Sequence, residues 1–276
     1  MSKPLCIICI LALLLLGTGV YFLLGQEPSA PMEIHCKHFF YGYPLGTPST
    51  NDLIIRDIYA MSSNDDTKFA DWVAYKLTAR EVLGIGDVER KWRKDPWLEE
   101  DETLEPKDYD KASKSLEIDR GHQAPLASFK GSIWAPLTNY LSNITPQKQK
   151  LNQGPWKNLE ETVRDIVKTG KTVYVMTGPL FEREMPKLPE CDKPHSLPSG
   201  YWKIIIVEID EDEFDWAAFI FDQDTSKKEK IMTFLTTIDE VERRSHLDFL
   251  WELEDNRENE IESDDHSTWA RTIFLK

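Results

Sequence analysis

The sequence has fewer basic than acidic residues, and this balance excludes proteins that coat nucleic acid by their overall positive charge. Its 33 lysines and arginines are outnumbered by 48 aspartates and glutamates, for a net charge of −15. A chain this acidic does not coat nucleic acid by bulk electrostatic attraction. A nucleic-acid ligand is compatible with it only where basic residues gather locally and a metal ion adds positive charge. Hydrophobic residues at 41% and charged residues at 29% are typical of a globular protein with a sizeable core.

The negative charge is concentrated near the C-terminus. Between Asp248 and Asp265, nine acidic residues are accompanied by Arg257 alone. Such a stretch predicts a solvated surface or tail that keeps the protein soluble, in preference to a partner-binding segment.

Cysteine is also scarce, with four residues in 276. Cys6 and Cys9 lie in an apolar run and are expected to act there as plain hydrophobes. Cys36 and Cys191 would face an oxidising compartment after export, where a single disulfide between them is plausible. The His-Cys-Lys-His sequence at 35–38 lacks a second ligand pair at zinc spacing, so we do not expect a zinc site.

A long apolar run is present at the N-terminus, from Leu5 to Leu24, preceded by Lys3. Twenty helical residues span about 30 Å, the thickness of a bilayer's hydrocarbon core. Two interpretations stay open: an uncleaved membrane anchor, or a signal peptide cleaved near Ser29-Ala30, where flanking prolines disfavour cleavage. Both keep Lys3 in the cytoplasm and export the rest of the chain, to be secreted, periplasmic or membrane-anchored. A buried core helix is a weaker alternative, because the run begins almost at the first residue.

The domain organisation follows from this run and from the absence of internal repeats. Residues 1–27 are predicted to be the signal peptide or membrane anchor, with membrane contact only if it is uncleaved. Residues 28–46 are turn-rich and are predicted to be a linker. Residues 47–276 are predicted to form one domain. The sequence predicts no oligomeric state.

Strand patterns dominate that domain. Lys68 to Thr78 alternates with Val73, Tyr75 and Leu77 on one side, which predicts a strand. Further strands are predicted at 171–177, 201–209 and 214–221, which are rich in β-branched and aromatic residues. A helix is predicted at 237–246, with Thr237 and Glu240 forming a capping box. The predicted fold is α+β: a central antiparallel sheet flanked by helices, preceded by the N-terminal hydrophobic helix.

One short motif stands between the first strand and the strand at 171. Residues 116–118 form a strand-like stub that runs into Asp119-Arg120-Gly121-His122. Gly121 is expected to turn the backbone sharply, so that Arg120 and His122 reach the same space. Each residue alone has a structural explanation: His122, for example, is compatible with a core histidine.

A second motif follows thirty residues later, from Asn152 into a helix that begins at Pro155. Its buried stripe is predicted to be Trp156, Leu159, Val163 and Ile166. Glu160 and Arg164 are four residues apart and therefore share a helix face. Taken singly, Asn152 could be only a helix cap, and Glu160 with Arg164 only a surface ion pair.

Together these motifs resemble the DNA/RNA non-specific endonucleases, the ββα-metal superfamily with the DRGH signature, closest to its secreted bacterial branch of Serratia type. The resemblance is nearly continuous from Lys68 to Arg244, over several ordered blocks. These blocks are residues 69–76, 90–96, 119–128, 140–147, 151–154, 175–181 and 198–203. The apolar run and the acidic stretch after Leu247 do not resemble the family's common core.

The resemblance implies a role for each matching residue. His122 matches the general base, Asn152 the direct ligand of Mg²⁺ (with Mn²⁺ as a substitute), and Glu160 an outer-sphere residue holding a metal-bound water. Phosphate-contacting arginines are matched by Arg90, Arg120 and Arg164, and further site residues by Asp119, Asn139 and Asn143. The implied activity is cleavage of DNA and RNA, without strong sequence preference, to 5′-phosphate and 3′-hydroxyl ends. The rival hypothesis is a catalytically silent nucleic-acid-binding module on the same scaffold.

The physical chemistry agrees with these roles. Water is a poor nucleophile at neutral pH, and a histidine with a pKa near 6.5 can take its proton during attack. Mg²⁺ prefers oxygen ligands and keeps most of its waters, so a single amide oxygen is a reasonable anchor. Arginine suits phosphate because its planar fork donates two hydrogen bonds at once. Contacts to the phosphate backbone carry no base information.

Overall fold

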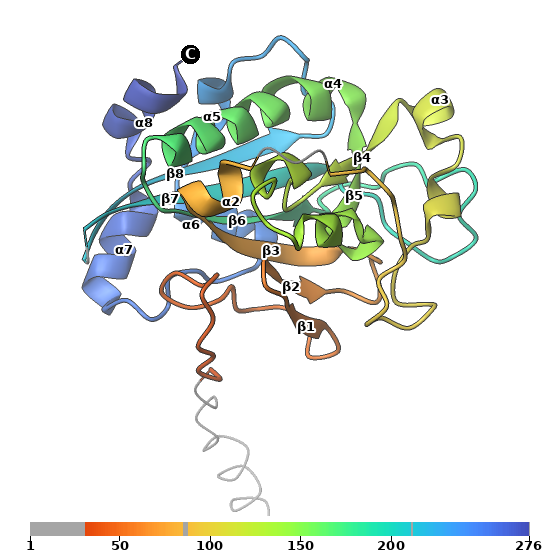
Figure 1. Ribbon diagram of the computed structural model, residues 1–276, viewed down its shortest axis with the longest axis horizontal. Coiled ribbons are helices and arrows are strands. Elements are labelled where there is room, and N and C mark those ends of the chain that lie inside the picture. Colours follow the sequence, from red (N-terminus) through yellow and green to blue (C-terminus); the bar gives the residue numbers. More distant parts are fainter. Residues whose placement is uncertain (1–30, 85–87, 211, 276) are drawn as a thin grey trace, which may run out of the picture. The chain divides into compact units, whose positions relative to one another are not determined.

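The computed structural model describes residues 31–84, 88–210 and 212–275 (Figure 1). The chain divides into two units, Met1–Ile34 and His35–Lys276. Every described helix and strand belongs to the second unit. The apolar run from Leu5 to Leu24 lies outside the described residues. Within the described ranges, no helix combines the length and the apolar character needed to cross a bilayer.

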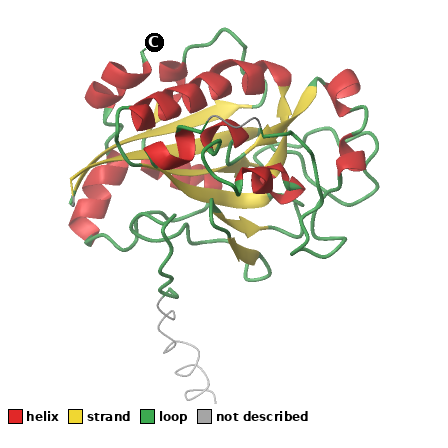
Figure 2. Cartoon of the chain, viewed as in Figure 1, coloured by secondary structure: helices red, strands yellow, loops and turns green. Residues whose placement is uncertain are grey.

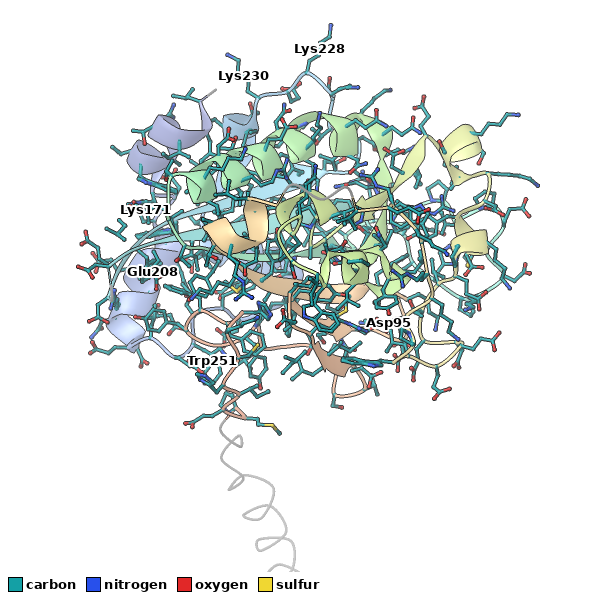
Figure 3. The ribbon with its side chains drawn as sticks, in the orientation of Figure 1. Asp95, Lys171, Glu208, Lys228, Lys230 and Trp251 are labelled. Carbon is teal, nitrogen blue, oxygen red and sulfur yellow. The ribbon has the colours of Figure 1, made fainter. Side chains whose placement is uncertain are left out.

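The globular unit begins earlier than the predicted linker allowed, because residues 35–46 pack against it. His38 is buried, and its Nε2 lies 3.0 Å from the Arg56 carbonyl oxygen. The Phe39 ring lies 6.0 Å from the ring of Trp72. The indole of Trp251, labelled in Figure 3, donates a hydrogen bond to the Tyr43 carbonyl (2.9 Å). Turn-forming residues predicted a linker here, but the aromatic side chains between them are partly buried against the sheet.

The core of the fold is a seven-stranded antiparallel sheet, which confirms the predicted class (Figures 1 and 2). Its strand order is β1-β2-β3-β6-β7-β8-β9, and a separate two-stranded sheet pairs β4 with β5. The strands are β1 Asp52–Ile55, β2 Ala60–Ser63, β3 Ala70–Leu77, β4 Ile118–His122, β5 Ile144–Lys148, β6 Val173–Leu180, β7 Gly200–Asp210, β8 Glu213–Asp222 and β9 Leu235–Thr236. The four predicted strands, one from alternation and three from their β-branched and aromatic residues, correspond to β3, β6, β7 and β8.

Helices cover both faces of the large sheet, as the ribbon in Figure 1 shows. The α-helices are α2 Ala79–Val82, α3 Ala112–Leu116, α4 Gln149–Leu151, α5 Lys157–Lys168, α6 Ile238–Ser245, α7 Asp255–Ser263 and α8 Ser267–Phe274. Short 3₁₀ turns are η1 Pro106–Tyr109, η2 Leu126–Ser128, η3 Ala135–Asn139, η4 Leu141–Asn143 and η6 Ile231–Phe234, and η5 Asn152–Trp156 is a π-helical turn.

Strand β7 shows how the two faces are divided. Tyr201, Ile205 and Val207 belong to the apolar cluster that includes α5 and α8 residues. Trp202 and Ile204 belong to the cluster on the other face, with α6 and α7 residues. Alternate side chains of a strand point to opposite faces, so a strand buried on both sides is apolar almost throughout.

Helix α5 buries the stripe that its spacing predicted. Leu159, Val163 and Ile166 are at most 9% exposed, and Trp156, just before the helix, is 2% exposed. Helix α6 begins as expected at Thr237, whose side chain accepts a hydrogen bond from the Glu240 N–H (3.1 Å). The reciprocal half of the predicted capping box is missing, because the Glu240 carboxylate pairs instead with Arg243.

The acidic C-terminal stretch is folded into helix α7 and the segments beside it, so of the two predicted alternatives it is a largely solvated surface and not a tail. Helices α7 and α8 bury Ile261, Ala270 and Phe274 against the sheet clusters. Glu262 is only 6% exposed, and burial beside Glu242 raises the pKa of its carboxyl group to about 9. The apolar residues are too widely spaced among the charges to stand out in the sequence.

The disulfide that the sequence left open is not formed. Cys36 and Cys191 are both free thiols. Cys36 packs beside the cluster on the α6–α7 face, whereas Cys191 packs beside a third cluster under the β4–β5 region. Sequence alone gives no distance between two cysteines, and a disulfide needs their Cα atoms within about 7 Å.

Candidate active site

The small sheet carries the first motif. Strand β4 contains all of Asp119, Arg120, Gly121 and His122, and it pairs with β5 from Ile118↔Lys148 to His122↔Ile144. The predicted stub begins two residues late, because α3 ends at Leu116 and Glu117 adopts a left-handed conformation.

Strand alternation, and not a turn at Gly121, brings Arg120 and His122 to one side. The two residues are two apart on β4, so their side chains share a face. Gly121 is required for another reason: a Cβ atom there would lie 2.6 Å from the Gln147 side chain. The expectation of a sharp turn is therefore wrong, although its consequence for Arg120 and His122 holds.

Asn152 begins a π-helical turn between α4 and α5. Its Nδ2 donates to Asp119 Oδ2 (2.9 Å), which also accepts from Gln153 Nε2 (2.8 Å). This bond uses the amide nitrogen, and Asn152 Oδ1 has no hydrogen-bond partner among the residues that the structure describes. Gly154 allows this turn to sit close to its neighbour, since a Cβ atom there would meet the Lys227 backbone at 2.8 Å. Single π-helical turns of this kind are common at functional sites.

His122 has a defined tautomer. Asn139 Nδ2 donates to the Glu89 carbonyl (3.2 Å), which directs Asn139 Oδ1 toward His122 Nε2, also at 3.2 Å. An amide oxygen only accepts, so Nε2 carries the proton and Nδ1 keeps the lone pair. The Trp92 ring lies 5.2 Å from the imidazole. Burial lowers the pKa of His122 to about 4, the nearby charge of Arg90 acts in the same direction, and the Asn139 hydrogen bond opposes both.

Glu160 and Arg164 both line the same cavity from α5. Among the described residues they form no direct ion pair, and Arg164 Nη1 is buried without a hydrogen-bond partner. Burial raises the pKa of Glu160, while the charges of Lys203 and Arg164 lower it. The surface ion pair that the spacing also allowed is therefore not what the structure contains.

Arg90 and Arg120 complete the predicted set. Arg120 Nη2 donates to the Pro106 carbonyl (2.8 Å), and its guanidinium lies over the Tyr109 ring at 5.1 Å. Arg90 is exposed and lines the cavity. The segment that carries Arg90 is anchored by Asp95, labelled in Figure 3, whose buried carboxylate accepts hydrogen bonds from Arg56 and Ser142, both at 2.5 Å.

Asn143, also expected among the site residues, does not line the cavity. It is fully buried, and its Oδ1 accepts from the Ala124 N–H (2.9 Å) while its Nδ2 donates to the Ala124 and Thr138 carbonyls (3.0 and 2.8 Å). With every polar atom used, Asn143 holds the loop after His122 in place and does not contact the cavity.

Other cavity residues had no role predicted from the sequence. Trp92 packs on His122, Gln153 supports Asp119, and Lys157 and Glu161 line the cavity beside Glu160. Trp92 stands two residues from Arg90. This spacing was the one feature of the sequence that could have indicated a place for Trp92 in the site. Lys157 and Glu161 would pass for an ordinary i,i+4 surface pair, with their charges 3.4 Å apart.

The cavity has a volume of about 710 Å³ and collects positive charge in an acidic protein. Seven of the nine predicted site residues line it, whereas Asn139 reaches it through its bond to His122 and Asn143 does not line it. The lining residues that carry charge or the motif are Arg90, Asp119, Arg120, His122, Asn152, Lys157, Glu160, Glu161 and Arg164. Cations among them outnumber carboxylates, although the whole chain carries −15. Such a cavity suits a polyanion.

The antiparallel sheet, the DRGH strand and this cationic cavity are those of a nuclease, a phosphodiester hydrolase. Residues 39–256 match the family described as DNA/RNA non-specific endonuclease, and the chain belongs to that family. The match ends within α7, so the rest of α7 and all of α8 lie beyond it.

Individual relatives agree with this assignment. The chain is 46% identical to a nuclease of Serratia marcescens over 213 residues, covering 76% of this chain and 78% of the relative. It is 29% identical to mitochondrial endonuclease G of Homo sapiens over 219 residues, covering 74% and 71%. The fold is similar to that of EndoG in a crystal structure of the EndoG/EndoGI complex, with a TM-score of 0.66 and 24% identity over 78% of this chain and 90% of that one.

Proposed function

We propose that this protein hydrolyses DNA and RNA by attack of water on phosphorus, with Nδ1 of His122 taking the proton. The observation that carries the proposal is the hydrogen bond from His122 Nε2 to Asn139 Oδ1, which leaves Nδ1 as the basic nitrogen at the cavity. Its lowered pKa keeps the imidazole neutral, as a base must be, at physiological pH. Cleavage on this scheme leaves 5′-phosphate and 3′-hydroxyl ends.

The donor atoms of the site fit a hydrated Mg²⁺ ion. Asn152 Nδ2 is bound to Asp119, so the atom that Asn152 offers is an oxygen, the donor that Mg²⁺ prefers. The Glu160 carboxylate lines the same cavity and would hold the ion through a water molecule. When bound, the ion offsets negative charge that develops on the phosphate, and Mn²⁺ accepts the same oxygen donors.

The arginines would hold the scissile phosphate. Arg90, Arg120 and Arg164 line the cavity on three different segments. Guanidinium groups bind phosphate oxygens and stabilise charge as it grows in the transition state. Contacts restricted to phosphate read no base edges, which supports activity on DNA and RNA of any sequence.

A plasmid-degradation assay tests the proposal against the catalytically silent module. Purified protein should convert supercoiled plasmid and total RNA to short fragments in Mg²⁺, and EDTA should stop the reaction. Mg²⁺ added in excess of EDTA should restore it. Retention of intact plasmid under all three conditions, with DNA still bound in a gel-shift assay, would favour the silent module.

Substitution of Arg90 should weaken cleavage of every substrate equally. Arg90→Ala removes one charge-assisted phosphate contact, and we expect cleavage to slow by on the order of 10- to 100-fold. The change should be the same on two unrelated DNA sequences, measured as initial rates. The rates should also fall with added salt, because phosphate contacts release counterions.

The matched control neutralises acidic residues on α7. Glu258→Gln with Glu260→Gln changes the net charge by more than Arg90→Ala does. Yet this double variant should leave the rates nearly unchanged, because charges beyond a Debye length of about 8 Å are screened at physiological salt. Glu262 is excluded from the control because it is buried. A sequence-selective effect of Arg90→Ala would contradict a phosphate contact.

The proposed location is outside the cytoplasm, supported by the apolar run after Lys3. Fractionation of cells expressing the full chain should find it exported. It should be either in the membrane with its N-terminus intact, or soluble and shortened near residues 25–30, as mass spectrometry would show. A full-length soluble protein in the cytoplasm would overturn this proposal.

A further inference from the structure

Lys203 is a charged residue in the most buried part of the sheet. It lies in the middle of β7, paired with Thr177 on β6 and Phe219 on β8, and it has no exposed surface. Strand alternation places its side chain with Tyr201 and Ile205, on the face that α5 covers. Its Nζ makes no hydrogen bond to any described residue. A buried ammonium is unfavourable unless a nearby negative charge compensates it.

The surroundings of Lys203 identify that charge. Its Nζ lies 4.3 Å from the centroid of the Trp156 ring and 6.0 Å from that of Tyr75. Trp156 and Glu160 are four residues apart at the start of α5 and therefore stand on the same side of the helix. The ammonium thus lies against the side of α5 that carries Glu160, and Glu160 is also a lining residue of the cavity.

The two charges act on each other. Burial lowers the pKa of Lys203 to about 8, and the Glu160 carboxylate is the charge that opposes this decrease. Burial raises the pKa of Glu160, and Lys203 opposes this more strongly than Arg164 does. A methionine or leucine at position 203 would pack on the same aromatic rings without any desolvation cost. Stability alone therefore does not explain a lysine at this position.

We propose that Lys203 is a positioning residue of the active site, whose buried ammonium is the counter-charge that keeps the Glu160 carboxylate ionised and directed to the cavity. It acts through Glu160 and does not touch substrate. The inference rests on the proposed function for its catalytic consequence, but the coupling of the two charges is a property of the protein without metal or substrate.

A double-mutant cycle tests the coupling. The variants are Lys203→Met, Glu160→Gln and the two combined, each compared with the unchanged protein. Lys203→Met should slow plasmid cleavage on the order of tenfold, whereas in the Glu160→Gln background it should cause no further loss. Lys76→Met is the matched control: Lys76 is on β3 of the same sheet, its Nζ also lies over an aromatic ring (Tyr174, 4.9 Å), and it does not line the cavity. This control should cleave at the normal rate.

The same four proteins are also compared by their thermal unfolding midpoints in EDTA. This measurement does not depend on nuclease activity. Glu160→Gln leaves Lys203 without its counter-charge and should lower the unfolding midpoint. Lys203→Met should raise the midpoint more in the Glu160→Gln background than alone, because only there does it remove an uncompensated charge.

Additive changes in both readouts, or normal cleavage by Lys203→Met, would overturn the inference. Should Lys203→Met not fold, an unchanged midpoint for Glu160→Gln would overturn it as well. Because unfolding is measured without metal, a protein that failed to cleave nucleic acid would refute the proposed function and still leave this coupling testable.

Discussion

Replacing His122 by alanine should reduce turnover by about 10²–10⁴-fold, the usual contribution of a general base. Nucleic-acid binding should survive, because Arg90, Arg120 and Arg164 remain in the cavity. Rates under saturating DNA, together with a gel-shift assay in EDTA, would separate turnover from binding. Near-normal turnover in the variant would end the assignment of His122 as the base.

The pH profile provides a second measurement on the same residue. A base must be neutral to act, so activity is lost as pH falls through its pKa in the folded protein. Burial lowers the pKa of His122 to about 4, below the ordinary 6.5. The unchanged enzyme should therefore keep its activity as pH falls past 6.5 and lose it near 4, under conditions where the protein remains folded. An acid limb centred at or above 6.5 would contradict the lowered pKa of His122.

Replacing Asn152 by alanine should produce the other large loss. Asn152 is proposed as the single direct protein ligand of the ion, and loss of even an outer-shell partner costs about 10–100-fold in metal affinity or activity. We expect a loss of at least that size, with saturation shifted to much higher Mg²⁺ concentration. The domain should remain folded, because the side chain is only partly buried and its hydrogen bond is to Asp119.

Gln153→Ala is the matched control for Asn152. Gln153 is the next residue and donates to the same Asp119 oxygen, but its side chain is exposed and no metal contact is proposed for it. This variant should keep the Mg²⁺ concentration dependence of the unchanged protein. If Asn152→Ala kept it too, a different residue would have to hold the ion.

Periodic local patterns predicted most of the fold. The alternation at 68–78 corresponds to β3, and the helical stripe from Trp156 to Ile166 corresponds to the buried face of α5. These predictions held because a period of two or 3.6 residues is a property of the element itself. The predictions that were overturned concerned stretches without a clear period: residues 35–46 of the linker, which belong to the globular unit, and the tail alternative for the acidic stretch after Asp248. In both, a few aromatic or aliphatic side chains pack among turn-forming or charged residues.

The residue types of the site could also be predicted, but their contacts could not. The order and spacing of DRGH, Asn152 and Glu160 indicated the family, and the match over residues 39–256 confirms it. Nothing local distinguished Asn139, which bonds to His122, from Asn143, which is held wholly within a loop. Both asparagines are buried and lie four residues apart. The direction of each side chain depends on which carbonyl its amide meets after folding.

The sequence by itself determined the fold class, the family and the kinds of side chain available for catalysis, because those are recorded in periodicity and in ordered motifs. Only the tertiary structure decided how the groups act on one another. It joined Asp119 to Asn152 across 33 residues, chose the tautomer of His122, left Cys36 and Cys191 free, and placed Lys203 beside Trp156, one helical turn from Glu160. The physical reason is that these interactions depend on sheet register and on burial. Both arise from contacts between segments far apart in the chain. A local sequence pattern does not predict the distance between such segments.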